Sequence, residues 1–188
     1  GAIVIAGIDT WDNAATPTVP QTAAGVIATA TASASTGSWA IGESNGRGSS
    51  KDTTWGTFDG GGVGASSATT GNENLTVTNG RPSAEVTLTI TNNGTVDLNL
   101  AMFHMDVVAF RPNAPRAYAL NVLAGSDITV GTVFTSADDA ITHLGGGLLT
   151  DDSDSATHDQ HDDLDLDLSG LDDHTLAVGE SALIQIAF

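Results

Sequence analysis

The chain of 188 residues contains no cysteine. A disulfide framework, thiolate metal sites and cysteine catalysis are therefore excluded. Aromatic residues make up only 5% of the chain, whereas hydrophobic residues reach 40%. We therefore expect a core built from small and β-branched side chains. No apolar run approaches the length of a membrane span, which predicts that this chain does not insert into a membrane.

Basic residues are also scarce. The chain has 5 Lys and Arg against 23 Asp and Glu, which gives a formal net charge of −18, and no basic residue follows Arg116. Such a chain repels phosphate groups, so we expect no binding to nucleic acid, and an anionic membrane surface is disfavoured for the same reason. The charge favours divalent cations, cationic partners and high ionic strength, because salt screens the self-repulsion.

The dominant pattern is an alternation of apolar and polar residues with a period of two. In AEVTLTITN (84–92), Val86, Leu88 and Ile90 occupy one face, and Glu85 and three threonines occupy the other. Similar runs separated by turn signals predict strands at 25–33, 74–79, 96–100, 118–123, 127–134, 164–168 and 181–188. The pattern predicts a single all-β domain over residues 1–188, a jelly-roll-like β-sandwich of about eight to ten strands.

Three local stretches refine this prediction. TNNGT (91–95) stands between two alternating runs and predicts a β-hairpin. MFHMDVVAF (102–110) is apolar on both faces apart from His104 and Asp106, which predicts a central strand or a strand with a bulge. Residues 42–73 are rich in Gly, Ser and Thr and predict long loops around one short strand.

Residues 151–173, DDSDSATHDQHDDLDLDLSGLDD, form an acidic segment with three interpretations: a calcium loop, a solvated acidic face or an adaptation to salt. Calcium takes roughly six to eight oxygen ligands. The candidate ligands that one loop would supply are Asp151, Asp152, Asp154, Asp159, Asp162 and Asp163. Their spacing matches neither the EF-hand loop nor the glycine-rich nonapeptide repeat. Calcium, the one cofactor predicted, therefore rests on composition.

The stretch DLDLDL (163–168) within the acidic segment alternates Asp with Leu. As a strand it would bury the three leucines and place Asp163, Asp165 and Asp167 on the outer face. Carboxylates two residues apart on a strand lie roughly 6–7 Å apart, too far for neighbours alone to chelate one ion. This stretch therefore predicts an acidic ladder that faces solvent, which also discourages accidental strand pairing.

Motifs for catalysis are missing from the sequence. His158 and His161 form an HxxH, but no glutamate follows the first histidine as the metalloprotease motif requires, and such a pair arises easily among so many aspartates. There is no GxSxG motif, and no glutamate stands in a glycosidase context. The chain is therefore predicted not to be an enzyme.

Two tryptophans are candidates for sugar binding. Trp39 and Trp55 flank the Gly/Ser-rich loops, where exposed rings would stack on a carbohydrate. The alternative for each ring is packing within the core, where a lone tryptophan most often lies.

Several stretches together resemble a known family. They are IDTWDNAATPTV, TWGTF, LTITNNGTVDLNLAMFHMDVVAFRPNAPRAYALNVLAGSDITVG and LDLDLSGLDDHTLAVGESALIQIAF. From Ile8 to Phe188 the chain is similar to the extracellular β-sandwich region of exported bacterial proteins that carry a PEP-CTERM sorting tail. The resemblance implies a secreted, cell-surface protein associated with matrix or biofilm polysaccharide. Such proteins usually continue with a further strand and then the sorting tail, so after Phe188 we expect either a tail that is removed by processing or a relative without one.

A sandwich without its last strand would expose a groove with unpaired backbone groups. The apolar start of the chain, GAIVIAGI (1–8), reads as the first strand of a mature chain, and we expect it to fill the groove of a neighbour. The donated side chains would be Ile3, Val4, Ile5 and Ile8. Because this head-to-tail contact does not close, it builds a filament.

The predicted function is therefore a secreted, non-enzymatic structural protein. It would be the self-associating subunit of an extracellular filament, sheath or matrix, with calcium as a candidate stabiliser. The alternative is a carbohydrate-binding module of the cell surface that uses Trp39 or Trp55.

Overall fold

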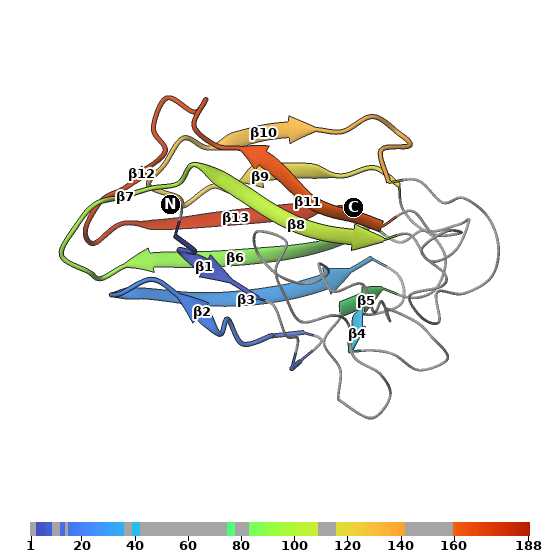
Figure 1. Cartoon of the computed structure of the whole chain (residues 1–188), viewed down its shortest axis with the longest axis horizontal. Helices are drawn as coiled ribbons and strands as arrows, with labels where there is room; N and C mark the ends of the chain where they lie inside the picture. Colours follow the sequence, from blue (N-terminus) through green and yellow to red (C-terminus); the bar gives the residue numbers. More distant parts are fainter. Residues whose placement is uncertain are drawn as a thin grey trace.

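The computed structural model describes residues 3–8, 12–13, 15–35, 39–41, 75–77, 83–108, 116–141 and 160–188. Every regular element in these ranges is a β-strand, and the strands form antiparallel sheets in a sandwich-like arrangement (Figure 1). The predicted all-β class is confirmed. Among the described residues no helix is long and apolar enough to cross a membrane.

The largest sheet has five strands in the order β10–β9–β13–β6–β3. Its strands are β3 (Val26–Ala34), β6 (Ala84–Asn92), β9 (Ala119–Val122), β10 (Gly131–Thr135) and β13 (Ser181–Ala187). Each strand runs antiparallel to its neighbours. The last strand of the chain, β13, lies at the centre of the sheet and pairs on both sides, with β6 and with β9.

A second layer lies over one face of this sheet (Figure 1). It contains β8 (Met102–Val108) paired with β11 (Gln160–Asp167), and the short strands β7 (Leu98–Asn99) and β12 (Thr175–Leu176), which pair with each other. Hydrogen bonds from Leu100 N to His174 O and from Leu168 N to Ala101 O join these pairs into one long ribbon. The bulge expected in 102–110 lies instead on the partner strand, where the register shifts between His161 and Leu164.

Two small pairs complete the described structure. β1 (Ala6–Gly7) pairs with β2 (Gln21–Thr22), and β4 (Trp39–Ile41) pairs with β5 (Leu75–Val77). The short strand predicted within 42–73 lies outside the described residues.

The outer edge of β3 is accompanied by the segment that precedes it. Ala32 N donates to Ala15 O at 2.8 Å, and Val26 N donates to Ala23 O at 3.0 Å. This segment contains the buried Pro17, which has no N–H to offer to a strand ladder. A segment with a proline that covers an edge strand is one of the ways in which proteins prevent that strand from pairing with another chain.

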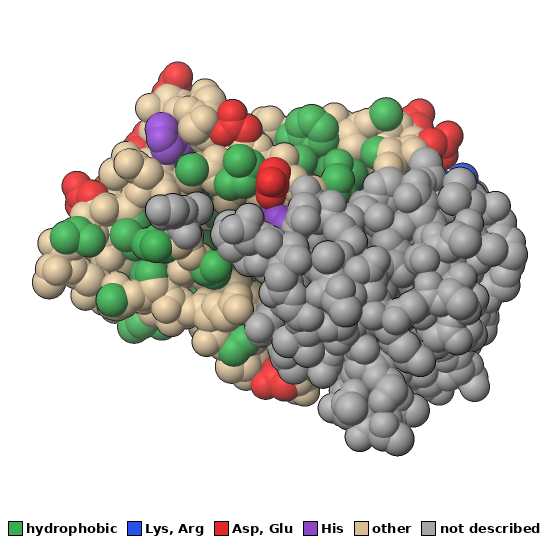
Figure 2. Space-filling model, viewed as in Figure 1, with side chains coloured by type: hydrophobic (Ala, Val, Ile, Leu, Met, Phe, Trp, Pro, Cys, Tyr) green, Lys and Arg blue, Asp and Glu red, His purple; other side chains and the backbone are tan. Residues whose placement is uncertain are grey.

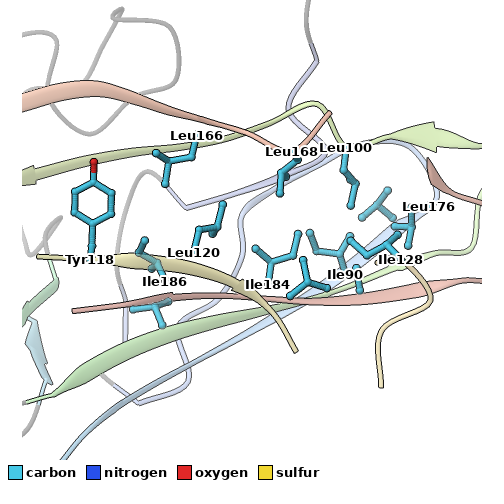
Figure 3. Close-up of a cluster of buried hydrophobic side chains, with 14 of the residues drawn as sticks. Ile90, Leu100, Tyr118, Leu120, Ile128, Leu166, Leu168, Leu176, Ile184 and Ile186 are labelled. Atoms are coloured by element: carbon cyan, nitrogen blue, oxygen red, sulfur yellow. The ribbon is translucent and has the colours of Figure 1, made fainter. Parts of the chain in front are cut away.

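The core lies between the five-strand sheet and the second layer. Figure 3 shows Leu166, Leu168 and Leu100 pointing from one layer toward Ile184 and Ile90 of the other. The buried cluster among the described residues is aliphatic apart from Tyr118, which agrees with the low aromatic content of the chain. Leucine and isoleucine make up most of this cluster, so the side chains of the core are larger than the composition alone indicated.

The hairpin predicted at TNNGT does not form. β6 pairs with β3 and β13, whereas β7 pairs with β12 in the other layer. The turn therefore carries the chain from one layer to the other instead of back along the same sheet. Asn93 N donates to Gly25 O at 2.8 Å, so the turn docks against the turn that precedes β3.

Candidate functional site

The outer face of the five-strand sheet carries mostly threonine and other uncharged polar side chains. Its strand positions on β3, β6 and β13 are Ile27, Thr29, Thr31, Ser33, Glu85, Thr87, Thr89, Thr91, Ser181, Leu183, Gln185 and Ala187. Ala119 and Asn121 of β9 and Thr132 of β10 extend the same side. We call these residues the threonine face.

The strand register arranges the threonine face in rows. Thr29 lies opposite Thr89, and Thr31 lies opposite Thr87. Every position of the face reaches solvent, because each is half-buried or exposed and none is buried. Glu85 is the only charged residue among these positions, in a chain with a formal net charge of −18. The threonine face is therefore almost free of charge.

One row of side-chain hydrogen bonds crosses all five strands. Ser33 Oγ donates to Glu85 Oε1 at 3.3 Å, and Gln185 Nε2 donates to Glu85 Oε2 at 3.2 Å. Asn121 Nδ2 donates to Gln185 Oε1 at 3.3 Å, and Thr132 Oγ1 donates to Asn121 Oδ1 at 2.9 Å. Both oxygens of the one carboxylate on this face are therefore occupied within the sheet. The row holds these side chains along the surface and not away from it.

The opposite layer carries the acidic ladder. Asp165 and Asp167 of β11 are exposed, whereas Leu166 is buried and Leu164 packs against the core. The prediction of inward leucines and outward carboxylates is confirmed at these positions; the side chain of Asp163 lies outside the described residues. In the coloured part of Figure 2, acidic side chains are scattered over the surface with hydrophobic side chains between them.

The carboxylates of the ladder are bonded to neighbouring protein groups. Asp165 Oδ1 lies 2.8 Å from Nδ1 of His104, its direct partner on β8. Asp167 Oδ1 accepts from the hydroxyl of Ser169 at 2.6 Å and from the backbone N–H of Ser169 at 2.8 Å. The Ser169 hydroxyl, followed by its N–H, lowers the pKa of Asp167 below the ordinary value of 3.8.

The predicted calcium ligands fall largely outside the described structure. Asp151, Asp152, Asp154 and Asp159 lie outside the described residues, and Asp162 and Asp163 are described only as backbone positions of β11. Within the described ranges, no group of three or more His, Asp or Glu side chains is placed to hold a metal ion. The calcium hypothesis stays a prediction.

The side chains of the two predicted sugar-binding residues are not described either. Trp39 is the first residue of β4, but its side chain is not among the described ones, and Trp55 lies outside the described residues. The carbohydrate alternative therefore stays a prediction too. It would show as a monomer that is retained on a polysaccharide column and released when Trp39 or Trp55 is replaced by alanine.

The N-terminal segment, residues 3–8, pairs inside its own chain. Ala6 and Gly7 form β1 and pair with β2, and Ala23 N donates to Ile5 O at 2.9 Å. Ile5 packs against the core, Val4 and Ile8 are half-buried, and Ile3 is 64% exposed. In the described structure this segment is therefore paired within its own copy, and its donation to a neighbour stays a prediction. Among the described residues no groove opens beside β13 itself, because β13 is paired on both sides.

The threonine face was not identified as a site from the sequence, although part of its signal was present. The outward threonines of 84–92 were evident from the alternation, and TATAS in β3 has the same period. What joins them into one face is the pairing of β3 with β6 across more than fifty residues of chain, shown by the hydrogen bond between Ser33 and Glu85. Local periodicity contains no information on that pairing.

Comparison with protein-family models, with curated proteins and with solved structures gives no match to this chain. The resemblance to exported proteins with a PEP-CTERM tail stays a prediction.

Proposed function

We propose that this protein is a secreted, non-enzymatic structural protein whose copies assemble with one another outside the cell. The observation that carries this proposal is the slight attachment of the N-terminal segment to its own chain. Among the described residues, strand β1 contributes Ala6 and Gly7 to a ladder with β2, and one further backbone hydrogen bond runs from Ala23 N to Ile5 O. Location outside the cell rests on the family resemblance and not on the geometry.

Exchange of this segment between copies is the form of assembly that fits the intrachain pairing. A neighbouring copy presents the same partner strand, Gln21–Thr22, and the same core contact for Ile5. Exchange therefore replaces each native contact by an identical one, which makes it a low-cost route to association. When each copy donates to the next, the series does not close and a filament grows.

A cysteine-free chain allows a direct test of exchange. Ala6 and Thr22 are opposite each other in the β1–β2 register, and residues opposite each other in an antiparallel pair lie within disulfide reach. We expect Ala6→Cys and Thr22→Cys, carried by separate chains and mixed during refolding, to form covalent heterodimers on oxidation. The measurement is the molecular mass on a non-reducing gel.

The matched control pairs Ala6→Cys with Thr175→Cys, whose native partner Asn99 lies in the other layer. This mixture should give no heterodimer above background. Exchange is refuted if the Ala6→Cys and Thr22→Cys chains also remain separate, while one chain that carries both cysteines closes an internal disulfide in monomers alone.

Calcium is proposed as a stabiliser of the assembly through the acidic segment. Because Asp165 and Asp167 are bonded to His104 and Ser169, the ligands would come from the aspartates at 151–163. The support is the density of carboxylates in that stretch and the preference of calcium for oxygen ligands.

A further inference from the structure

We propose that the threonine face is a contact surface between two copies of this chain, which pack sheet against sheet about a twofold axis. This inference rests on the proposed self-association and assigns it a second interface. Exchange of residues 3–8 links copies in series, whereas contact between identical faces joins them in pairs.

Charge determines which surface can be shared by two copies. Two chains of net charge −18 repel each other, and contact through the acidic ladder would bring like charges together. The threonine face avoids this cost. Its one carboxylate, Glu85, accepts hydrogen bonds from Ser33 and Gln185 in the same copy.

The position of Glu85 also suits a twofold contact. Glu85 lies near one end of β6 and Thr89 lies near its middle. Four residues of strand span roughly 13 Å. A twofold axis that lies between the two faces, perpendicular to β6 and close to Thr89, therefore places the two Glu85 carboxylates roughly 25 Å apart, well beyond the Debye length of about 8 Å at physiological salt.

The side chains of the face are suited to packing. Threonine is stiff at χ1, so ordering it against a partner costs little rotamer entropy. Its methyl groups, together with Leu183 and the 57% exposed Ile27, supply apolar surface to a second sheet. Two sheets in contact lie about 10 Å apart, and their side chains interdigitate at that spacing.

The sheet edges are less suited than the face. The proline-bearing segment that contains Ala15 and Pro17 runs beside β3. Strand β10 is short, and its register with β9 shifts between Thr132 and Phe134. Covers, short strands and bulges are devices that prevent edge-to-edge pairing. The face is therefore the part of the five-strand sheet that remains available to a second copy.

The test is the substitution Thr89→Glu, measured by analytical ultracentrifugation over a concentration series. Under a twofold axis near Thr89 the two new carboxylates face each other, so we expect association to weaken about ten-fold or more. Two variants accompany it. Ala124→Glu adds the same charge at an exposed turn and should change association less than about two-fold. Thr89→Val keeps the β-branched shape and adds no charge, so it should not weaken association as Thr89→Glu does.

The outcomes separate this inference from the proposed function. Equal weakening by Thr89→Glu and Ala124→Glu, or none by either, overturns the face as an interface, and the cysteine assay on Ala6 and Thr22 then decides exchange independently. A parent that is monomeric at every concentration overturns the face contact as well. The face contact is also overturned if the protein is a monomer that binds a neutral polysaccharide column and loses this binding on Thr89→Glu, because the face would then bind a glycan.

Discussion

The side chain of Asn92 donates from Nδ2 to the carbonyl oxygen of Leu176 at 2.9 Å and so connects the two layers of the sandwich. The same Nδ2 donates to Val96 O at 2.9 Å, and Oδ1 accepts from Gly94 N at 3.0 Å. Asn92 is fully buried, yet its donors and its acceptor are satisfied. It holds the crossing turn in place at the end of β6.

We expect Asn92→Ala to lower the free energy of unfolding by about 1–3 kcal/mol, because the buried carbonyl of Leu176, the carbonyl of Val96 and the N–H of Gly94 lose their partner. Urea denaturation measures the change. Asn93→Ala is the control, since its side chain is exposed at the next position of the same turn. Equal losses in the two variants would show that the Asn92 side chain does not hold the turn.

Gly25 and Gly179 share a left-handed backbone but differ in the space around them. Gly25 has φ +76°, and a Cβ there would lie 2.4 Å from Gly94 Cα. Gly179 has φ +88° with no atom within 4 Å of such a Cβ. We expect Gly179→Ala to cost about 1–2 kcal/mol of stability from backbone strain alone, and Gly25→Ala to cost clearly more, because backbone atoms must also move apart.

Thermal unfolding of these two alanine variants measures the difference. If Gly25→Ala is no less stable than Gly179→Ala, the close approach of the turns around Gly25 and Gly94 is not part of the folded state.

The two faces of β11 should respond very differently to substitution. Leu166→Ala removes a buried side chain and should cost about 2–5 kcal/mol of unfolding free energy. Asp165→Asn weakens a pair with His104 in which the aspartate side chain is 51% exposed, and should cost less than about 1 kcal/mol. Both values come from urea denaturation. A larger loss for Asp165→Asn than for Leu166→Ala would contradict the assigned orientation of the strand.

The pKa of Asp167 should depend on Ser169. The Ser169 hydroxyl and N–H stabilise the carboxylate and hold its pKa below the ordinary value of 3.8. Since the folded pKa is lowered, this contribution to stability is present above the unfolded pKa and is lost as the pH falls through the folded pKa. Ser169→Ala should raise the pKa of Asp167 toward 3.8 in an NMR titration.

Asp12 is the internal control for that titration, because its pKa is lowered by Thr18 and not by Ser169. An unchanged pKa at Asp167, or an equal rise at Asp12, would refute the assigned cause.

Salt and calcium should separate the three interpretations of the acidic segment. Because the net charge is −18, we expect the melting temperature to rise with sodium chloride over a broad range as repulsion is screened. The calcium hypothesis adds a saturable rise at millimolar calcium that equal magnesium does not produce and that a chelator reverses. Equal responses to calcium and magnesium would leave only the solvated acidic face and salt adaptation.

Much of the local structure followed from alternation. The outward Asp165 and Asp167 and the inward leucines of 164–168 could be predicted because the side chains of a strand alternate, and burial of leucine decides which face turns inward. The partners of a strand could not be predicted in this way. TNNGT has the residues of a hairpin turn, yet Asn92 finds its side-chain partner at Leu176, 84 residues later, and the turn crosses between layers.

The sequence by itself determined that the chain is all-β, which positions along each strand are apolar, and that one stretch collects the negative charge. These properties depend on neighbours in the chain, so a local pattern is sufficient to establish them. Only the tertiary structure decided that β13 lies at the centre of the sheet, that Ala6 and Gly7 pair with β2, and that threonines from separate strands share one face with a single charged residue, Glu85. Those outcomes depend on which distant segments bury their apolar faces together, a choice made by the packing of the whole core.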